Sequence, residues 1–286
     1  MTKNKPNVYI IGVQKSGTTS LYHTLKNHEN IFGPEIKDYK KSHPFFFDQN
    51  YFETKESQFL KLFKNHKHEK LIITSDVDII ESEEAMNRVK LYSKNPKIII
   101  CVRNPFTRIE SMYKFYKQIG KIKENCSFEK AVNSNYDMFL KRSLYFDKLN
   151  RAFSIFDYEN VMLVHFEEII DPAKNTQIFN NICHFLDIDE KRIKLIHKNK
   201  TKKKRKSVFR KIFEIGRGSK IRNKTIKIFD KFVDANKRYL IKEFLFNNKK
   251  GRTNIENIDI PEDIQVLLKN DAKKVFEKFR IHLIRP

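Results

Sequence analysis

Short apolar runs alternate with amphipathic stretches along the first two-thirds of the chain. The runs have the length of strands and are rich in β-branched residues, and each is followed by apolar residues at helical spacing. The pattern predicts strands over 8–13, 70–74, 97–102 and 161–165, and helices over 18–27, 81–93, 106–119, 128–133, 136–156 and 173–186. Because strands alternate with helices, we expect a parallel sheet covered on both faces.

Beyond residue 190 the pattern is mostly helical and charged, and it ends in a predicted amphipathic helix over 261–280. A chain of 286 residues with 40% hydrophobic content can bury one substantial core, and no linker of low complexity divides it. We therefore predict a single domain over 1–286, with an α/β core over about 6–190 and a helical, basic part over about 191–286.

Targeting signals and cysteine chemistry receive little support from the sequence. The longest apolar runs are too short to span a bilayer, and the first one ends in a loop that does not look like a cleavage site. The three cysteines are odd in number and scattered, which argues against a disulfide framework or a zinc site. We predict no signal peptide, no anchor and a cytoplasmic location.

The net charge of +23 predicts a field that attracts polyanions. Much of this charge lies late in the chain, in a nearly continuous basic run from Lys198 to Lys206. Four interpretations stay open: a solvated lysine-rich surface, a site for the phosphates of a nucleotide, contact with an anionic acceptor or membrane surface, and nucleic-acid binding. The basic run lacks interleaved aromatic residues and no known nucleic-acid-binding motif is present, so nucleic acid is not the expected partner.

A glycine-bracketed loop follows the first predicted strand. Gly12 and Gly17 have the spacing of a P-loop, but Thr18 and Thr19 stand where a Walker loop carries Lys and Ser or Thr. The cation is Lys15, inside the loop. The loop leads into a predicted helix, whose N-terminus favours an anion. It predicts phosphate binding without ATP hydrolysis; a nucleotide kinase or another P-loop phosphotransferase is the alternative.

A second block combines a buried strand, an arginine, a proline and a helix. Arg103 ends the strand predicted over 97–102, and Ser111 follows within the next helix. Because ligands of parallel α/β sheets bind at the carboxyl ends of the strands, both motifs are expected at the same edge of the sheet.

Together, the two blocks resemble the PAPS-dependent sulfotransferases, where PAPS is 3′-phosphoadenosine 5′-phosphosulfate. In that family a K-x-G-T-T-S-L loop binds the 5′-phosphosulfate and an R-N-P-x-x-R-x-x-S-x-Y block binds the 3′-phosphate. Residues 42–48 are similar to the family's K-E-x-H-F-F-D segment, 140–145 to its R-G-x-Y segment and 160–167 to its last core strand. The resemblance covers about 6–190, is closest to the carbohydrate-type and bacterial branch, and implies a P-loop-like three-layer fold.

The resemblance implies a role for each matching residue. Lys15 would stabilise charge on the leaving phosphate, and Arg103 with Ser111 would hold the 3′-phosphate. Backbone N–H groups and hydroxyls at the start of the first helix would hold the 5′-phosphate. The complete predicted donor site is Lys15, Ser16, Gly17, Thr18, Thr19, Ser20, Arg103, Ser111, Arg142 and Tyr145.

The general base is the point where the chain departs from the family pattern. His43 stands where the family has its Glu, and Ser42 replaces the preceding Lys. Histidine is a competent base near neutral pH, so His43 is the predicted catalytic base beside Lys15. The alternatives are Glu35 or Asp38 in a shifted register, or a histidine that only packs. Cations that could replace the missing Lys are Lys37, Lys40 and Lys41.

The acceptor is less well indicated than the donor. Asp76 and Asp78 follow the strand predicted over 70–74, where the family often has a Glu-Lys or Thr-Pro pair near the acceptor. The predicted function is transfer of a sulfuryl group from PAPS to a hydroxyl of a carbohydrate or glycan by in-line displacement, with PAP (adenosine 3′,5′-bisphosphate) as product and no metal.

Overall fold

The computed structural model describes residues 5–35, 47, 56–118, 120–123, 125–190 and 258–284. These residues belong to two compact units. The first contains those up to Tyr113, those of 128–190 and those from Ile260 onward, and the second contains those of 114–127 and 258–259. His43 and the basic run Lys198–Lys206 lie outside the described residues.

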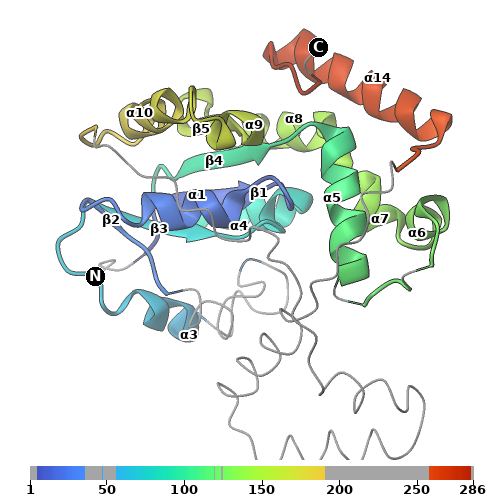
Figure 1. Cartoon of the computed structure of the whole chain (residues 1–286). Coiled ribbons are helices and arrows are strands. Elements are labelled where there is room, and N and C mark those ends of the chain that lie inside the picture. The colour runs from blue at the N-terminus through green and yellow to red at the C-terminus, as the bar shows by residue number, and fades with distance from the viewer. Residues whose placement is uncertain are drawn as a thin grey trace, which may run out of the picture. The chain divides into compact units, whose positions relative to one another are not determined.

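A parallel five-stranded sheet forms the centre of the first unit (Figure 1). Its strands are β1 (Val8–Gly12), β2 (Ile31–Phe32), β3 (Leu71–Ser75), β4 (Lys97–Val102) and β5 (Val161–His165). Their order is β2-β3-β1-β4-β5, and every neighbouring pair is parallel. β1 is central, with Val8 opposite Ile73 of β3 and Lys97 of β4. The predicted α/β fold with a parallel sheet is confirmed.

Helices cover both faces of this sheet. The α-helices are α1 (Thr18–Leu25), α3 (Glu56–Leu60), α4 (Glu83–Tyr92), α5 (Pro105–Gln118), α6 (Phe128–Ser134), α7 (Tyr136–Phe139), α8 (Phe146–Ile155), α9 (Phe166–Ile170), α10 (Asn175–Phe185) and α14 (Glu262–Phe279). Short 3₁₀ turns span Lys61–Phe63, Ile79–Glu81, Lys141–Ser143 and Tyr158–Asn160.

Alternate residues of the strands feed two separate hydrophobic clusters, as expected for a sheet buried on both faces. Tyr9 and Ile11 of β1 pack on one face with residues of α4, α8 and α14. Val8 and Ile10 pack on the other face with residues of α1 and α10. The fold therefore has three layers, and the carboxyl ends of β1, β3 and β4 meet at one edge.

The helix predicted over 136–156 is wrong as a continuous element. α7 ends at Phe139, and α8 begins at Phe146 after a 3₁₀ turn. The side chain of Asp271 on α14 accepts hydrogen bonds from the backbone N–H groups of Tyr145 at 2.6 Å and Phe146 at 3.2 Å. It caps a new helix start, as an acidic side chain at a helix N-terminus does. β2 and α9 were not expected.

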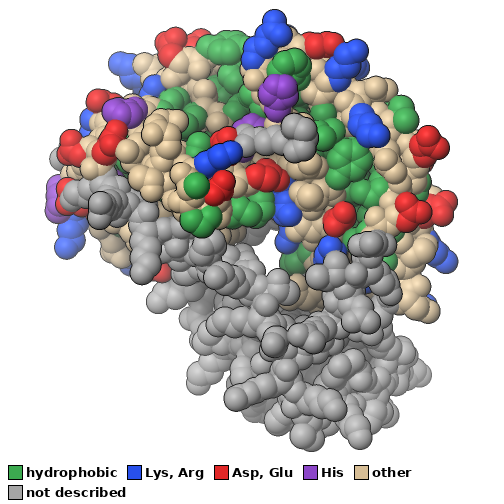
Figure 2. All heavy atoms as spheres, turned by 45° about the horizontal axis from the view of Figure 1, so that its top comes forward, with side chains coloured by type: hydrophobic (Ala, Val, Ile, Leu, Met, Phe, Trp, Pro, Cys, Tyr) green, Lys and Arg blue, Asp and Glu red, His purple; other side chains and the backbone are tan. Residues whose placement is uncertain are grey.

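Most of the C-terminal third lies outside the described residues, except for 258–284. α14 (Glu262–Phe279) agrees with the helix expected over 261–280. Among the described residues, no helix is long and apolar enough to cross a membrane. On the face shown in Figure 2, Lys and Arg side chains are interspersed with Asp and Glu over the described surface.

Candidate active site

The loop between β1 and α1 is shaped for an anion. Gly17 is the N-cap of α1 and has φ 79° and ψ 9°, in the left-handed region that favours glycine. A Cβ atom at this position would lie 2.6 Å from the Phe166 ring, so a side chain does not fit. No side-chain hydrogen bond caps the helix. The N-terminus of α1 therefore presents its backbone N–H groups to a ligand.

Lys15 is held inside this loop in an uncommon backbone conformation. Its φ of 75° is left-handed, which is rare for a residue with a side chain. The pKa of Lys15 is lowered to about 8, mainly by burial and in addition by the nearby charges of Arg103 and Arg108. Three cations thus converge on the loop, and an anion bound there would relieve their mutual repulsion. The residues present fit the phosphates of PAPS.

Arg103 joins the loop to the end of β4. Its Nη1 donates a hydrogen bond to the backbone oxygen of Lys15 at 3.0 Å, and its Nε donates to Oγ1 of Thr107 at 2.9 Å. The guanidinium lies 4.5 Å from the centroid of the Phe166 ring, in cation–π contact. Phe166 therefore touches both Arg103 and the Gly17 position, and it fixes the two motifs relative to each other.

Arg108 is the residue of the site whose role the sequence analysis missed. Its side chain is fully buried. It donates to the backbone oxygens of Gln14 at 3.1 Å, Met138 at 3.0 Å and Phe139 at 2.9 Å, and to Oγ of Ser143 at 3.0 Å. Arg108 thus connects the phosphate loop to the end of α7 and to the 3₁₀ turn that follows it. Its presence in the R-N-P-x-x-R motif was the available signal.

The other predicted donor residues differ in exposure. The side chains of Ser16 and Tyr145 are fully buried, and Thr18 is nearly so. Burial raises the pKa of Tyr145 to about 12, opposed by the charge of Arg108 and by the neighbouring Ser16 hydroxyl. Thr19 is exposed, whereas Ser20 and Ser111, the latter in the second turn of α5, are half-buried. The donor roles given to these residues stay predictions.

Arg142 lies beside β3 rather than against the loop backbone. Its Nη1 is 2.5 Å from Oδ1 of Asp78 and 3.4 Å from Oε1 of Gln14. A cavity of about 350 Å³ opens at this point, lined by these three residues and by Asp76. Because Gln14 directly precedes Lys15, the cavity adjoins the phosphate loop.

The identity of the base is not resolved by the described residues. His43 and Asp38 lie outside them, as do Lys37, Lys40 and Lys41. Glu35 is described; its side chain is mostly exposed, and its Oε1 lies 2.6 Å from Nζ of the mostly buried Lys26.

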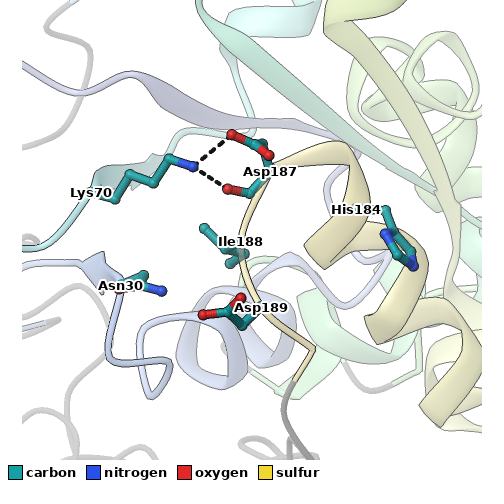
Figure 3. Close-up of a pocket in the computed structure, with 6 residues that line it drawn as sticks. All are labelled: Asn30, Lys70, His184, Asp187, Ile188 and Asp189. Carbon is teal, nitrogen blue, oxygen red and sulfur yellow. Dashed lines mark hydrogen bonds and ion pairs between the residues drawn. The ribbon is translucent and has the colours of Figure 1, made fainter.

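A second cavity, of about 370 Å³, lies at the opposite end of the strands and is lined by Asn30, Lys70 and Asp187 among others (Figure 3). Lys70 directly precedes β3, so this cavity is at the amino end of the strand. Nζ of Lys70 donates to the backbone oxygen of Asp187 and, at 2.6 Å, to its carboxylate. The ion pair fastens the end of the α10 region to the sheet, far from the loop that carries Lys15.

The family model described as the sulfotransferase domain matches residues 5–244. The chain therefore belongs to the PAPS-dependent sulfotransferase family, as its two motifs and parallel sheet indicated. The sequence resemblance is confirmed at the level of the family.

Individual relatives are distant. Heparan sulfate glucosamine 3-O-sulfotransferase 5 of Mus musculus is 27% identical over 190 residues, which cover 62% of this chain and 53% of that protein. Membrane-associated sulfotransferase kil1 of Dictyostelium discoideum is 29% identical over 140 residues, or 46% of this chain and 28% of that protein. The chain thus spans about half or less of the length of these relatives.

Among solved structures, a sulfotransferase from Alicyclobacillus acidocaldarius is similar with a TM-score of 0.57 and 22% identity. The match covers 68% of this chain and 87% of that one. At this identity the likeness concerns the fold.

Proposed function

We propose that the chain is a PAPS-dependent sulfotransferase that transfers a sulfuryl group to a hydroxyl of a carbohydrate or glycan and releases PAP. The observation that carries the proposal is Lys15, held in a phosphate loop with a pKa lowered to about 8 and hydrogen-bonded through its backbone oxygen to Arg103. A lysine placed among cations in a helix-opening loop is suited to charge that builds on a leaving phosphate.

Different residues of the site would contact different parts of the donor. The N–H groups at the start of α1, with the hydroxyls of Thr18, Thr19 and Ser20, would hold the 5′-phosphate. Arg103 and Ser111 would hold the 3′-phosphate, the arginine by a charge-assisted fork. Lys15 would stabilise the phosphate oxygen as its bond to sulfur breaks.

The proton of the acceptor hydroxyl needs a base within hydrogen-bond reach. We assign this role to His43, with Glu35 and Asp38 as alternatives. A carbohydrate acceptor is supported by the heparan sulfate enzymes among the relatives. We further propose that the reaction needs no metal and takes place in the cytoplasm.

The proposal is tested by incubating the purified protein with ³⁵S-labelled PAPS and a panel of oligosaccharides. Radiolabel should appear in a sugar with release of an equal amount of PAP, and Lys15→Ala should lower the rate of this transfer by about 10²–10³. Lys64→Ala, which removes an exposed lysine outside the site, is the matched control. Equal transfer by Lys15→Ala and the parent, or phosphate transfer from ATP with Mg²⁺, would refute the proposed function.

A further inference from the structure

The cavity at the carboxyl end of β3 adjoins the phosphate loop, and Arg142 is the one predicted donor residue among the described residues of its lining. The cavity has a volume of about 350 Å³. The backbone N–H of Asp76 donates to the backbone oxygen of Ile10 at 2.9 Å, which holds the end of β3 against β1. Gln14, one residue before Lys15, lines the cavity. A hydroxyl bound there lies next to the predicted sulfuryl-transfer centre.

The charges on the cavity wall are mainly acidic. Asp76 and Asp78 both line it, and Oδ1 of Asp76 accepts a hydrogen bond from the backbone N–H of Asp78 at 3.0 Å. Arg142 pairs with Asp78 at 2.5 Å. The described residues of the wall thus include two carboxylates and one guanidinium, in a chain whose net charge is +23.

The remaining wall is neutral or apolar. Phe47, Ile79 and Met138 contribute apolar surface, and Ser82 contributes a hydroxyl that already accepts a hydrogen bond from the backbone N–H of Ala85. Small-molecule sites commonly combine such apolar walls with a few polar groups that orient the ligand. The polar groups here can accept hydrogen bonds from hydroxyls, whereas an anion would face two carboxylates.

We propose that this cavity is the acceptor site, and that Asp76 and Asp78 select uncharged, hydroxyl-bearing sugars against polyanionic glycans. The inference rests on the proposed sulfotransferase function and deepens it. Carboxylates of an acceptor brought within a few ångströms of Asp76 and Asp78 are repelled, because like charges near a protein surface repel each other strongly at such short distances. The hydroxyls of a neutral sugar are instead hydrogen-bonded by the same two side chains.

The test compares two acceptors with the same backbone and different charge. N-acetylheparosan carries one carboxylate per disaccharide, and its carboxyl-reduced derivative carries none. With ³⁵S-labelled PAPS, the parent protein should label the reduced polymer at least about tenfold faster than N-acetylheparosan. Calorimetric titration with PAP, run in parallel, reports separately on the donor site.

Variants then test whether residues of the cavity cause the preference for the uncharged polymer. Asp76→Asn and Asp78→Asn should each lower the ratio of the two rates, and the double variant should remove the preference while PAP affinity is retained. The ratio is informative even where a variant slows both reactions. Asp157→Asn, an exposed carboxylate outside the cavity, should leave the ratio unchanged.

Faster or equal labelling of N-acetylheparosan by the parent would overturn the proposal. It would also be overturned by a ratio that does not change in the double variant, or by PAP binding without label in either polymer. A protein that binds no PAP would refute the sulfotransferase function itself, and the inference with it.

Discussion

The carboxyl ends of β4 and β3 lie on either side of β1 and carry opposite charge. Lys15, Arg103 and Arg108 gather where β1 and β4 end, and their proximity contributes to the lowered pKa of Lys15. Asp76 and Asp78 gather where β3 ends, and Arg142 forms an ion pair with Asp78. A single sheet edge therefore holds a cationic donor region and an acidic cavity. Position on the fold fixes where ligands bind, and side chains decide which ligands.

The two regions also differ in how the chain builds them. Lys15 and Arg103 of the predicted donor region come from two continuous motifs, each of which follows its own strand. The cavity is assembled from four separate segments, represented by Gln14, Phe47, Asp76 and Arg142. The first kind of site is visible in a sequence, and the second appears only when the chain is folded.

The largest effect should come from substitution of Arg108, whose hydrogen bonds hold the phosphate loop against the end of α7 and the turn that follows it. Because Arg108→Ala removes the donor of four hydrogen bonds, among them the buried ones to the oxygens of Phe139 and Ser143, we expect a loss of about 3–5 kcal/mol in the free energy of unfolding. Urea denaturation measures this loss. Arg108→Lys should recover little of this stability, since the ammonium group of lysine cannot reproduce the planar arrangement of donors in a guanidinium. A stable Arg108→Ala protein that merely binds PAP weakly would show that Arg108 belongs to the ligand site instead.

Lys15→Ala should lower the turnover number of sulfuryl transfer by about 10²–10³. The protein should stay folded, because Lys15 lies in a loop and not in the core. The turnover number of Lys15→Arg, which keeps the charge with a different shape, should lie between those of the parent and of Lys15→Ala. Steady-state kinetics with labelled PAPS and a neutral sugar gives the comparison. A variant that loses affinity for PAP but keeps its turnover would make Lys15 a binding residue only.

Arg103→Ala should weaken PAP binding by about ten- to a hundredfold, as expected for the loss of charge-assisted hydrogen bonds. Arg280→Ala removes an exposed guanidinium at the end of α14 and serves as the control. The two variants together separate a local contact from the general attraction of a basic protein for an anion. Equal weakening in both would favour the general attraction.

A smaller, pH-dependent effect follows from the pKa of Lys15, which is lowered to about 8. Below this pH the side chain is charged and ready for an anion. Above it the free protein must take up a proton on binding, so PAP affinity should fall by at most about tenfold per pH unit as the pH rises. Calorimetry in buffers of different ionisation enthalpy measures the proton uptake. Lys15→Arg should abolish it, and an unchanged pH dependence in that variant would exclude Lys15 as its source.

The sequence predicted four of the five described strands and the position of the glycine-bracketed loop, because both are local. β4 was predicted with its observed bounds, and the loop from Gly12 to Gly17 was identified by its spacing. The break between α7 and α8 was not predictable from its own residues, because the side chain that caps α8 is Asp271, about 125 residues away along the chain. The base assigned to His43 stays a prediction.

The net charge of the chain does not describe the local charge at the cavity. Residues 191–257 contain 24 Lys and Arg against 5 Asp and Glu, so this segment holds most of the net charge of +23. The net charge therefore says little about the acidic cavity beside Lys15. A polyanionic acceptor, which the overall charge favours, is the one that our proposed acceptor site would disfavour.

The most direct test of the donor region is calorimetric titration of the parent, Lys15→Ala and Arg103→Ala proteins with PAP and, separately, with ATP and Mg²⁺. The account predicts metal-independent binding of PAP by the parent, a marked loss of affinity in Arg103→Ala, and no preference for ATP with Mg²⁺. Preference of the parent for ATP with Mg²⁺, or PAP binding unaffected in Arg103→Ala, would contradict the assignment of this sheet edge to a sulfotransferase donor.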